Sequence, residues 1–145
     1  MRVLDVMSTR LVTISPEHSV WHAARVMLSE HVSGLPVLDD ARALVGLITE
    51  GDLLRRSELG TPLADGGVEA RARAYVRSRS WKVGALMSSP VLTVAEEAPL
   101  SQVAQLLGAH RIKRLPVLRD AQLVGIVSRA DLLKVISAGG PDAEV

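Results

Sequence analysis

The chain has 145 residues, with 17 Lys and Arg against 16 Asp and Glu, so its net charge at pH 7 is only +1. Such a balance provides no long-range field to gather nucleic acid or an anionic membrane, and the 2% aromatic content disfavours base stacking. The absence of cysteine excludes disulfides and Cys-ligated zinc. Since no apolar run has the length of a membrane span or a signal-peptide core, we expect a cytoplasmic protein.

An internal repeat organises the chain, because residues 3–54 align with residues 83–133. The copies share a Met-Ser pair, a Leu-Pro-Val-Leu run and an Asp-Leu-Leu run. A copy of about 50 residues buries too little apolar surface to be stable alone, so we expect the two copies to pack as one pseudo-two-fold pair. We predict repeat 1 at 1–56, a linker with a short helix at 57–82, repeat 2 at 83–137 and a flexible tail at 138–145.

Each copy predicts the element order β-α-β-β-α, which is an α/β (α+β) fold. The first strand corresponds to residues 12–14, and to 91–94 in the second copy. Apolar residues at helical spacing follow, starting at Val20 and Leu100. Ser19 is a suitable N-cap for the first of these helices, and Pro99 suits the first turn of the other.

A β-hairpin and a second helix complete each copy. In the first copy, apolar runs at 35–38 and 44–48 flank the polar turn 39–42, which predicts two paired strands. The last helix is expected to begin near Asp52, and near Asp131 in the second copy.

The end of each hairpin carries the pattern Gly-x-x-Thr/Ser-x-x-Asp, at Gly46–Asp52 and Gly125–Asp131. A glycine within a strand indicates close approach of another backbone or of a flat ligand. The hydroxyl and the carboxylate fall where a strand runs into a helix, a place that favours an anion, and a carboxylate can accept from two vicinal ribose hydroxyls. The same residue types are also ordinary helix caps, so both interpretations stay open.

Two basic residues, Lys113 and Arg114, directly precede a buried strand of the second copy, where they either hold phosphate or protect the sheet edge. The first copy has Ser33-Gly34 at this place. The basic residues of 71–79 fit a solvated helix face better than a phosphate site.

The sequence predicts neither a metal site nor catalysis. His18 is expected to lie outside the helix that Ser19 caps, and therefore off the face of His22, while His31 and His110 are expected at equivalent helix exits. Because no Ser-His-Asp set, paired-carboxylate cleft or glycine-rich phosphate loop occurs, we expect no enzyme.

Together these features resemble a tandem pair of CBS domains, the module named after cystathionine β-synthase and also called a Bateman module. The resemblance covers both repeats and is carried by Val6-Met7-Ser8, Leu86-Met87-Ser88, the Leu-Pro-Val strands and the repeated Asp motif. It implies a ligand-sensing regulatory module, with no required cofactor, that binds an adenosine ligand such as AMP, ADP, ATP, S-adenosylmethionine or NAD. It also implies a homodimer that acts on a partner in trans.

The resemblance further implies roles for individual residues. Asp52 and Asp131 would hold ribose, with Thr49 and Ser128 near the ribose or phosphates. The other implied nucleotide-binding residues are Lys113 and Arg114 at the phosphate, Thr13, Ile14, Thr93 and Val94 at the adenine, and Arg129. Because Ser33-Gly34 replaces the basic pair, the two clefts are not expected to be equivalent. The alternatives are a structural dimerisation module without a nucleotide, and an accessory subunit that binds polyanions.

Overall fold

The computed structural model describes residues 1–55 and 81–139. The chain divides into two compact units: unit 1 is Met1–Leu11 with Leu92–Val145, and unit 2 is Val12–Val91. Each unit thus combines the main part of one sequence repeat with the leading segment of the other, at residues 3–8 or 83–88. The short helix predicted in the linker and residues 140–145 of the predicted tail lie outside the described residues.

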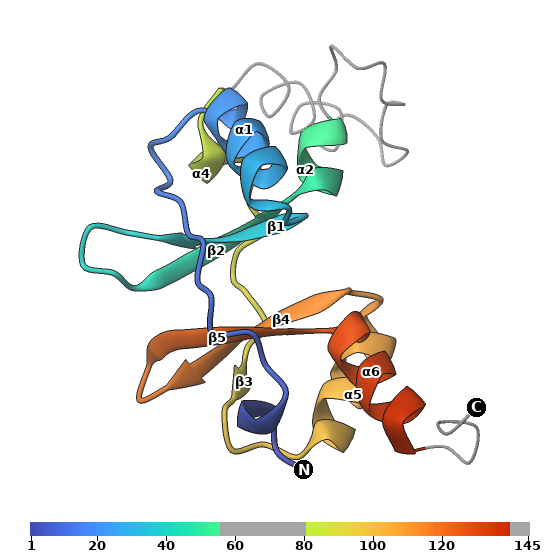
Figure 1. Cartoon of the computed structure of the whole chain (residues 1–145). Coiled ribbons are helices and arrows are strands. Elements are labelled where there is room, and N and C mark those ends of the chain that lie inside the picture. Colours follow the sequence, from blue (N-terminus) through green and yellow to red (C-terminus); the bar gives the residue numbers. More distant parts are fainter. Residues whose placement is uncertain (56–80, 140–145) are drawn as a thin grey trace, which may run out of the picture. The chain divides into compact units, whose positions relative to one another are not determined.

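Unit 2 has its helices on one face of a two-stranded hairpin (Figure 1). Its elements are α1 (Val20–Glu30), β1 (Gly34–Leu38), β2 (Leu44–Thr49), α2 (Glu50–Leu54) and α4 (Val83–Leu86). The strands β1 and β2 are antiparallel, with Leu35 opposite Ile48. These two side chains are fully buried, and they join Val83 and Leu86 of the leading segment in one hydrophobic core.

Unit 1 repeats this plan with a three-stranded sheet (Figure 1). Its elements are the 3-10 helix η1 (Val3–Asp5), β3 (Val94–Ala95), α5 (Leu100–His110), β4 (Arg114–Arg119), β5 (Gln122–Ser128) and α6 (Arg129–Gly139). The strand order is β3-β4-β5, with β3 parallel to β4 and β4 antiparallel to β5. Val3 of the leading segment is fully buried against Val103 and Leu107 of α5 and the apolar residues of β4.

The predicted fold class, helices and hairpins are confirmed. Ser19 caps α1, because its Oγ accepts a hydrogen bond of 3.0 Å from the backbone N–H of His22. Some details differ. The strand at 12–14 is reduced to a single bridge between Ile14 and Val37, and the strand predicted at 91–94 is only Val94–Ala95. Pro99 is the N-cap of α5 rather than part of its first turn, and η1 and α4 were not predicted.

The prediction for the helix exits is wrong in one respect. His31 ends α1 with a left-handed backbone (φ 57°), but the corresponding residue after α5 is Arg111 (φ 53°), and His110 is the last residue of the helix. His18 does lie outside α1, as predicted, and its Nδ1 accepts a hydrogen bond from the Ser15 N–H.

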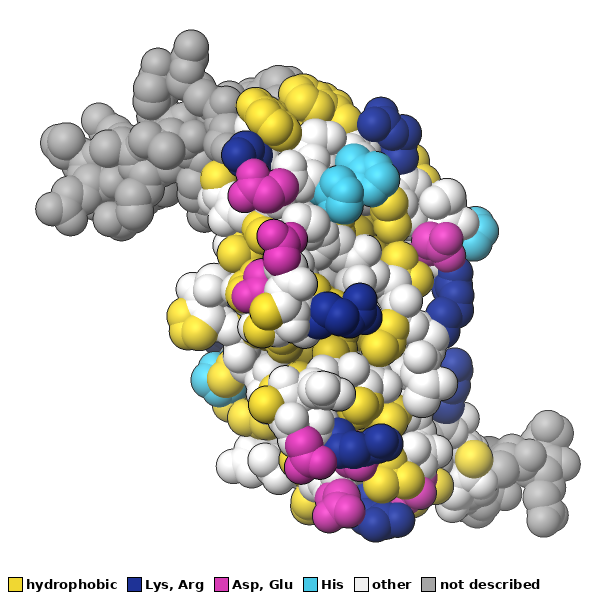
Figure 2. Space-filling model, turned by 90° about the vertical axis from the view of Figure 1, so that its left-hand side faces the viewer, with side chains coloured by type: hydrophobic (Ala, Val, Ile, Leu, Met, Phe, Trp, Pro, Cys, Tyr) yellow, Lys and Arg dark blue, Asp and Glu magenta, His cyan; other side chains and the backbone are white. Residues whose placement is uncertain are grey.

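Several large hydrophobic side chains remain exposed on the helices. Leu28 on α1 and Leu54 on α2 are exposed in unit 2, and Leu133 and Ile136 on α6 are exposed in unit 1. On the face drawn in Figure 2, hydrophobic side chains lie among charged ones of both signs. In the described ranges, no helix is long and apolar enough to cross a membrane.

Candidate functional site

The repeated Thr/Ser-x-x-Asp motif forms the same hydrogen-bonded turn in both units. At the start of α2, Asp52 Oδ2 accepts hydrogen bonds from the Thr49 N–H (2.8 Å) and hydroxyl (3.1 Å), and Thr49 Oγ1 accepts one from the Asp52 N–H (3.3 Å). Asp131 and Ser128 make the same three bonds with the same lengths at the start of α6. The capping interpretation of the motif is therefore confirmed. It occupies only one oxygen of each carboxylate.

The other carboxylate oxygen, Oδ1, has different hydrogen-bonding surroundings in the two units. Asp52 Oδ1 forms an ion pair with the guanidinium of Arg55, and the Asp52 side chain is only 2% exposed. Asp131 is half-buried, and its Oδ1 has no hydrogen-bond partner within the part of the chain that the structure describes. Asp131 can therefore accept a further hydrogen bond without losing one.

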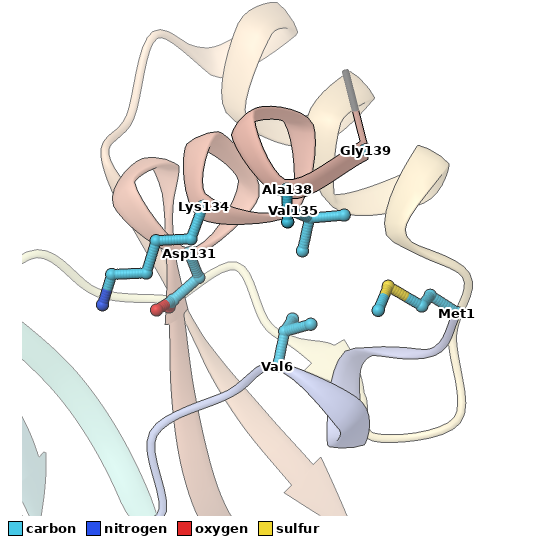
Figure 3. A pocket seen from close by; sticks show the side chains of 7 residues that line it. All are labelled: Met1, Val6, Asp131, Lys134, Val135, Ala138 and Gly139. Carbon is cyan, nitrogen blue, oxygen red and sulfur yellow. The ribbon is translucent and has the colours of Figure 1, made fainter. Parts of the chain in front are cut away.

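A pocket of about 530 Å³ lies beside Asp131, within unit 1. Figure 3 shows the side chains of α6 on one side of it and those of Val6 and Met1 on the other. Asp131 and Lys134 lie at one end, whereas Val135 and Ala138 continue along the helix as an apolar wall. An apolar wall beside a few polar groups is the usual composition of a small-molecule site.

The predicted phosphate residues lie at the same end of the unit 1 hairpin as this carboxylate. Arg114 is the first residue of β4 and lies opposite Ser128 in the strand register. The Arg129 N–H donates to the Lys113 carbonyl at 2.9 Å, so both residues lie beside the start of α6. Three cationic residues and the open oxygen of Asp131 thus gather at one end of one hairpin.

The same end of the hairpin in unit 2 is built alike but charged differently. Gly34 lies opposite Thr49, and the Glu50 N–H donates to the Ser33 carbonyl at 2.9 Å. Glu50 therefore takes the place that Arg129 has in unit 1, and Ser33-Gly34 the place of the basic pair. This end consequently lacks counterparts of the three cationic residues at the end of the unit 1 hairpin.

The residues predicted near adenine divide into two kinds. The side chains of Ile14 and Val94 are buried in the two hydrophobic cores. Thr13 and Thr93, one position earlier, are half-buried and keep part of their surface accessible.

Sequence reasoning missed Arg55, Lys134 and the apolar wall of α6. The two basic residues stand at matching positions, three residues after the motif Asp, and this was a signal that the repeat alignment contained.

The expectation that His18 lies off the face of His22 is wrong, because the two rings are close together. The rings of His18 and His22 lie 4.4 Å apart. Across residues 1–55 and 81–139, no group of three or more His, Cys, Asp or Glu side chains is placed to hold a metal ion.

A family model decides the assignment, because the CBS domain model matches the chain twice, at residues 3–58 and 83–138. The chain belongs to the CBS domain family. As a CBS pair, it is 29% identical to the CBS domain-containing protein YhcV of Bacillus subtilis over 130 residues, covering 90% of this chain and 81% of the relative.

Other relatives are much longer than this CBS pair. Inosine-5'-monophosphate dehydrogenase of Methanocaldococcus jannaschii is 30% identical over 90% of this chain, and homoserine O-acetyltransferase of Methanosphaerula palustris is 31% identical over 94% of it. The chain spans 22% and 24% of these two enzymes, respectively.

Two solved CBS pairs with adenosine compounds are similar in structure. CBSX2 in complex with AMP has a TM-score of 0.82 and 30% identity, covering 93% of this chain and 95% of that one. The CBS domain pair of protein MJ0100, in complex with 5-methylthioadenosine and S-adenosyl-L-methionine, has a TM-score of 0.73 and 25% identity, covering 94% and 99%.

Proposed function

We propose that this CBS pair is a regulatory module that binds an adenosine nucleotide at the Asp131 end of unit 1. The observation that carries the proposal is that Lys113, Arg114 and Arg129 lie at the same end of the unit 1 hairpin as the open oxygen of Asp131. The AMP complex of the similar CBSX2 supports the choice of ligand. The CBS domain model matches residues 3–58 and 83–138, and a chain made up mainly of this module fits a regulatory role better than a catalytic one.

Each part of the ligand has a chemically suitable partner in unit 1. The ribose hydroxyls donate to Asp131 Oδ1, while Ser128 holds Oδ2 and so fixes the orientation of the carboxylate. The guanidinium and ammonium groups at the start of β4 and α6 bind the phosphate, as charge-assisted donors do. Thr93 contributes the polar contact on the adenine side.

The output of such a module is a change in the populations of its conformations. A bound nucleotide stabilises the conformation that holds it more tightly, and a partner protein acting in trans distinguishes the two states.

Thermal unfolding with AMP, ADP, ATP, S-adenosylmethionine and NAD tests the proposal. A ligand at 100 times its dissociation constant stabilises the folded state by about 2.7 kcal/mol. We expect AMP to raise the Tm of the wild-type chain, inorganic phosphate to have little effect, and Arg114→Gln to reduce the shift. The exposed α1 residue Arg25 provides the matched control, because Arg25→Gln removes the same charge in unit 2. An unchanged Tm with every adenosine ligand at millimolar concentration contradicts the proposal.

We also propose that the chain forms a homodimer through its exposed helical residues. Leu133 and Ile136 on α6 are 63% and 69% exposed, and two large apolar side chains on one helix favour a partner surface. This observation equally supports the second candidate, a dimerisation module without a ligand. Sedimentation equilibrium of the wild type and of Leu133→Glu/Ile136→Glu tests the dimer: we expect a dimer that the double substitution converts to a monomer, and a wild-type monomer contradicts it.

A further inference from the structure

We infer that Arg55 occupies the ribose acceptor of Asp52, so that the chain has one open nucleoside site, at Asp131, and a second that its own guanidinium holds closed. The inference rests on the proposed function, because it takes the motif carboxylates to be ribose acceptors. It adds a residue, Arg55, that controls how many sites are available.

Both carboxylate oxygens of Asp52 already accept hydrogen bonds. Oδ2 accepts from the N–H and the hydroxyl of Thr49, and Oδ1 accepts from Arg55. With the side chain only 2% exposed, a ribose hydroxyl reaches Oδ1 only if the guanidinium leaves. The Arg55 guanidinium can move away from Asp52, because its side chain is 58% exposed and the residue lies just after the end of α2. Arg55 thus closes the site reversibly.

The matching position in unit 1 is Lys134, which leaves its carboxylate open. Lys134 stands three residues after Asp131, as Arg55 stands three residues after Asp52, but it forms no ion pair with the described residues of unit 1. Its side chain lies at the end of the pocket beside the carboxylate (Figure 3). A planar guanidinium matches a carboxylate oxygen in a fixed geometry, whereas an ammonium is a strongly hydrated point charge. The difference between Arg and Lys therefore accounts for the difference between the two sites.

An uncharged nucleoside is the probe that isolates this effect. The phosphate of a nucleotide would be repelled by Glu50 of unit 2 and attracted by the cations of unit 1. These interactions would mask the contribution of the carboxylates to the affinity. Adenosine carries the ribose without the phosphate. Displacing a hydrogen bond to a charged group weakens binding by a factor of about ten, so the Asp52 site should bind adenosine about tenfold more weakly than the same site without Arg55.

The test is an adenosine titration followed through the backbone amide NMR signals of Thr49, Asp52, Ser128 and Asp131. In the wild type we expect saturation at Ser128 and Asp131 and little change at Thr49 and Asp52. Arg55→Lys and Arg55→Gln should both strengthen binding at Asp52 about tenfold. Lys134→Arg, the reciprocal change, should weaken binding at Asp131 by a similar factor. Arg25→Gln, on the exposed side of α1, is the control, which should leave the Asp52 and Asp131 signals as they are in the wild type.

The possible results separate the inference from the proposed function. Binding at Asp52 that is as tight in the wild type as in both Arg55 variants overturns the role of Arg55 while adenosine binding stands. If neither motif responds to adenosine in any variant, and AMP is also without effect, the proposed function fails and the inference fails with it. Arg55→Lys keeps the charge and the aliphatic part of the side chain, so the test can still be made with this variant if Arg55→Gln does not fold.

Discussion

Met87 lies directly over Gly46, and a Cβ atom built on this glycine would be 2.2 Å from the Met87 Sδ. Unit 1 repeats the arrangement, because a Cβ on Gly125 would be 2.7 Å from Met7 Sδ and 2.8 Å from the carbonyl oxygen of Ser8. The residue after each methionine pairs with the strand: Ser88 bridges to Leu47, and Ser8 to Ile126. Among the described residues, the close neighbour of each strand glycine is the leading segment of the other repeat.

The first prediction is that a methyl group at either glycine is destabilising. Gly125→Ala should lower the free energy of unfolding by about 1–3 kcal/mol, because the methyl group meets backbone as well as a side chain. Gly46→Ala should cost less, since its nearest atoms belong to the flexible Met87 side chain. Urea denaturation measures both.

A matched control lies in the same chain. Gly108 is in α5, and a Cβ there meets nothing within 4 Å. Gly108→Ala should therefore stabilise the protein by about 0.5–1 kcal/mol, because alanine is the better helix former. Equal effects at Gly108 and Gly125 would show that packing of the leading segment is not the cause.

The second prediction concerns the helix caps. Ser128→Ala removes the hydroxyl that accepts from the Asp131 N–H, and should cost about 1 kcal/mol of stability. Thr49→Ala should cost a similar amount at α2. A loss well below this in both variants, measured by urea denaturation without ligand, would mean that these hydroxyls contribute little to capping.

The third prediction separates the two carboxylates in the absence of ligand. An Asn at either position can keep its oxygen toward Thr49 or Ser128, which directs its NH₂ group to the other side. In Asp52→Asn that NH₂ group faces the Arg55 guanidinium at a buried position, and both groups are hydrogen-bond donors. We therefore expect the free energy of unfolding to fall by about 2 kcal/mol. In Asp131→Asn the NH₂ group faces the open side, and the loss should be smaller. Equal losses in urea denaturation would contradict the difference between the two sites.

The repeat, the helices, the hairpins and the motif carboxylates could be predicted because each depends on local periodicity or capping chemistry. The exchange of leading segments could not, since nothing local in Met7-Ser8 says which sheet it pairs with. The different surroundings of the Asp52 and Asp131 carboxylates could not be predicted either. They depend on whether the basic side chain three residues later reaches the carboxylate. The strand glycines show the limit clearly: their spacing indicated a close approach, but only the fold identifies Met87 as the neighbour.

The fourth prediction uses the ion pair between Glu96 and Arg119 in unit 1. The Arg119 Nε and terminal nitrogen donate to the two Glu96 oxygens at 2.6 and 2.9 Å, and these hydrogen bonds hold the pKa of Glu96 below its ordinary value of 4.5. A carboxylate with a lowered pKa stabilises the folded state above its unfolded pKa, and this contribution is lost as the pH falls through the folded pKa. Wild type should therefore be more stable than Arg119→Gln at pH 7, with a difference that shrinks below pH 4.5. A difference independent of pH in urea denaturation would contradict this.

Calorimetric titration with AMP tests the proposed function most directly. We expect saturable binding to the wild type and to Glu97→Gln, an exposed charge change in the same unit, and binding at least tenfold weaker in Asp131→Asn. The amide of that variant keeps the Ser128 hydrogen bonds but presents a donor to the ribose. A loss of AMP affinity can therefore be distinguished from a loss of folding. AMP binding of equal affinity in the wild type and Asp131→Asn would contradict the assignment of Asp131 as the ribose acceptor.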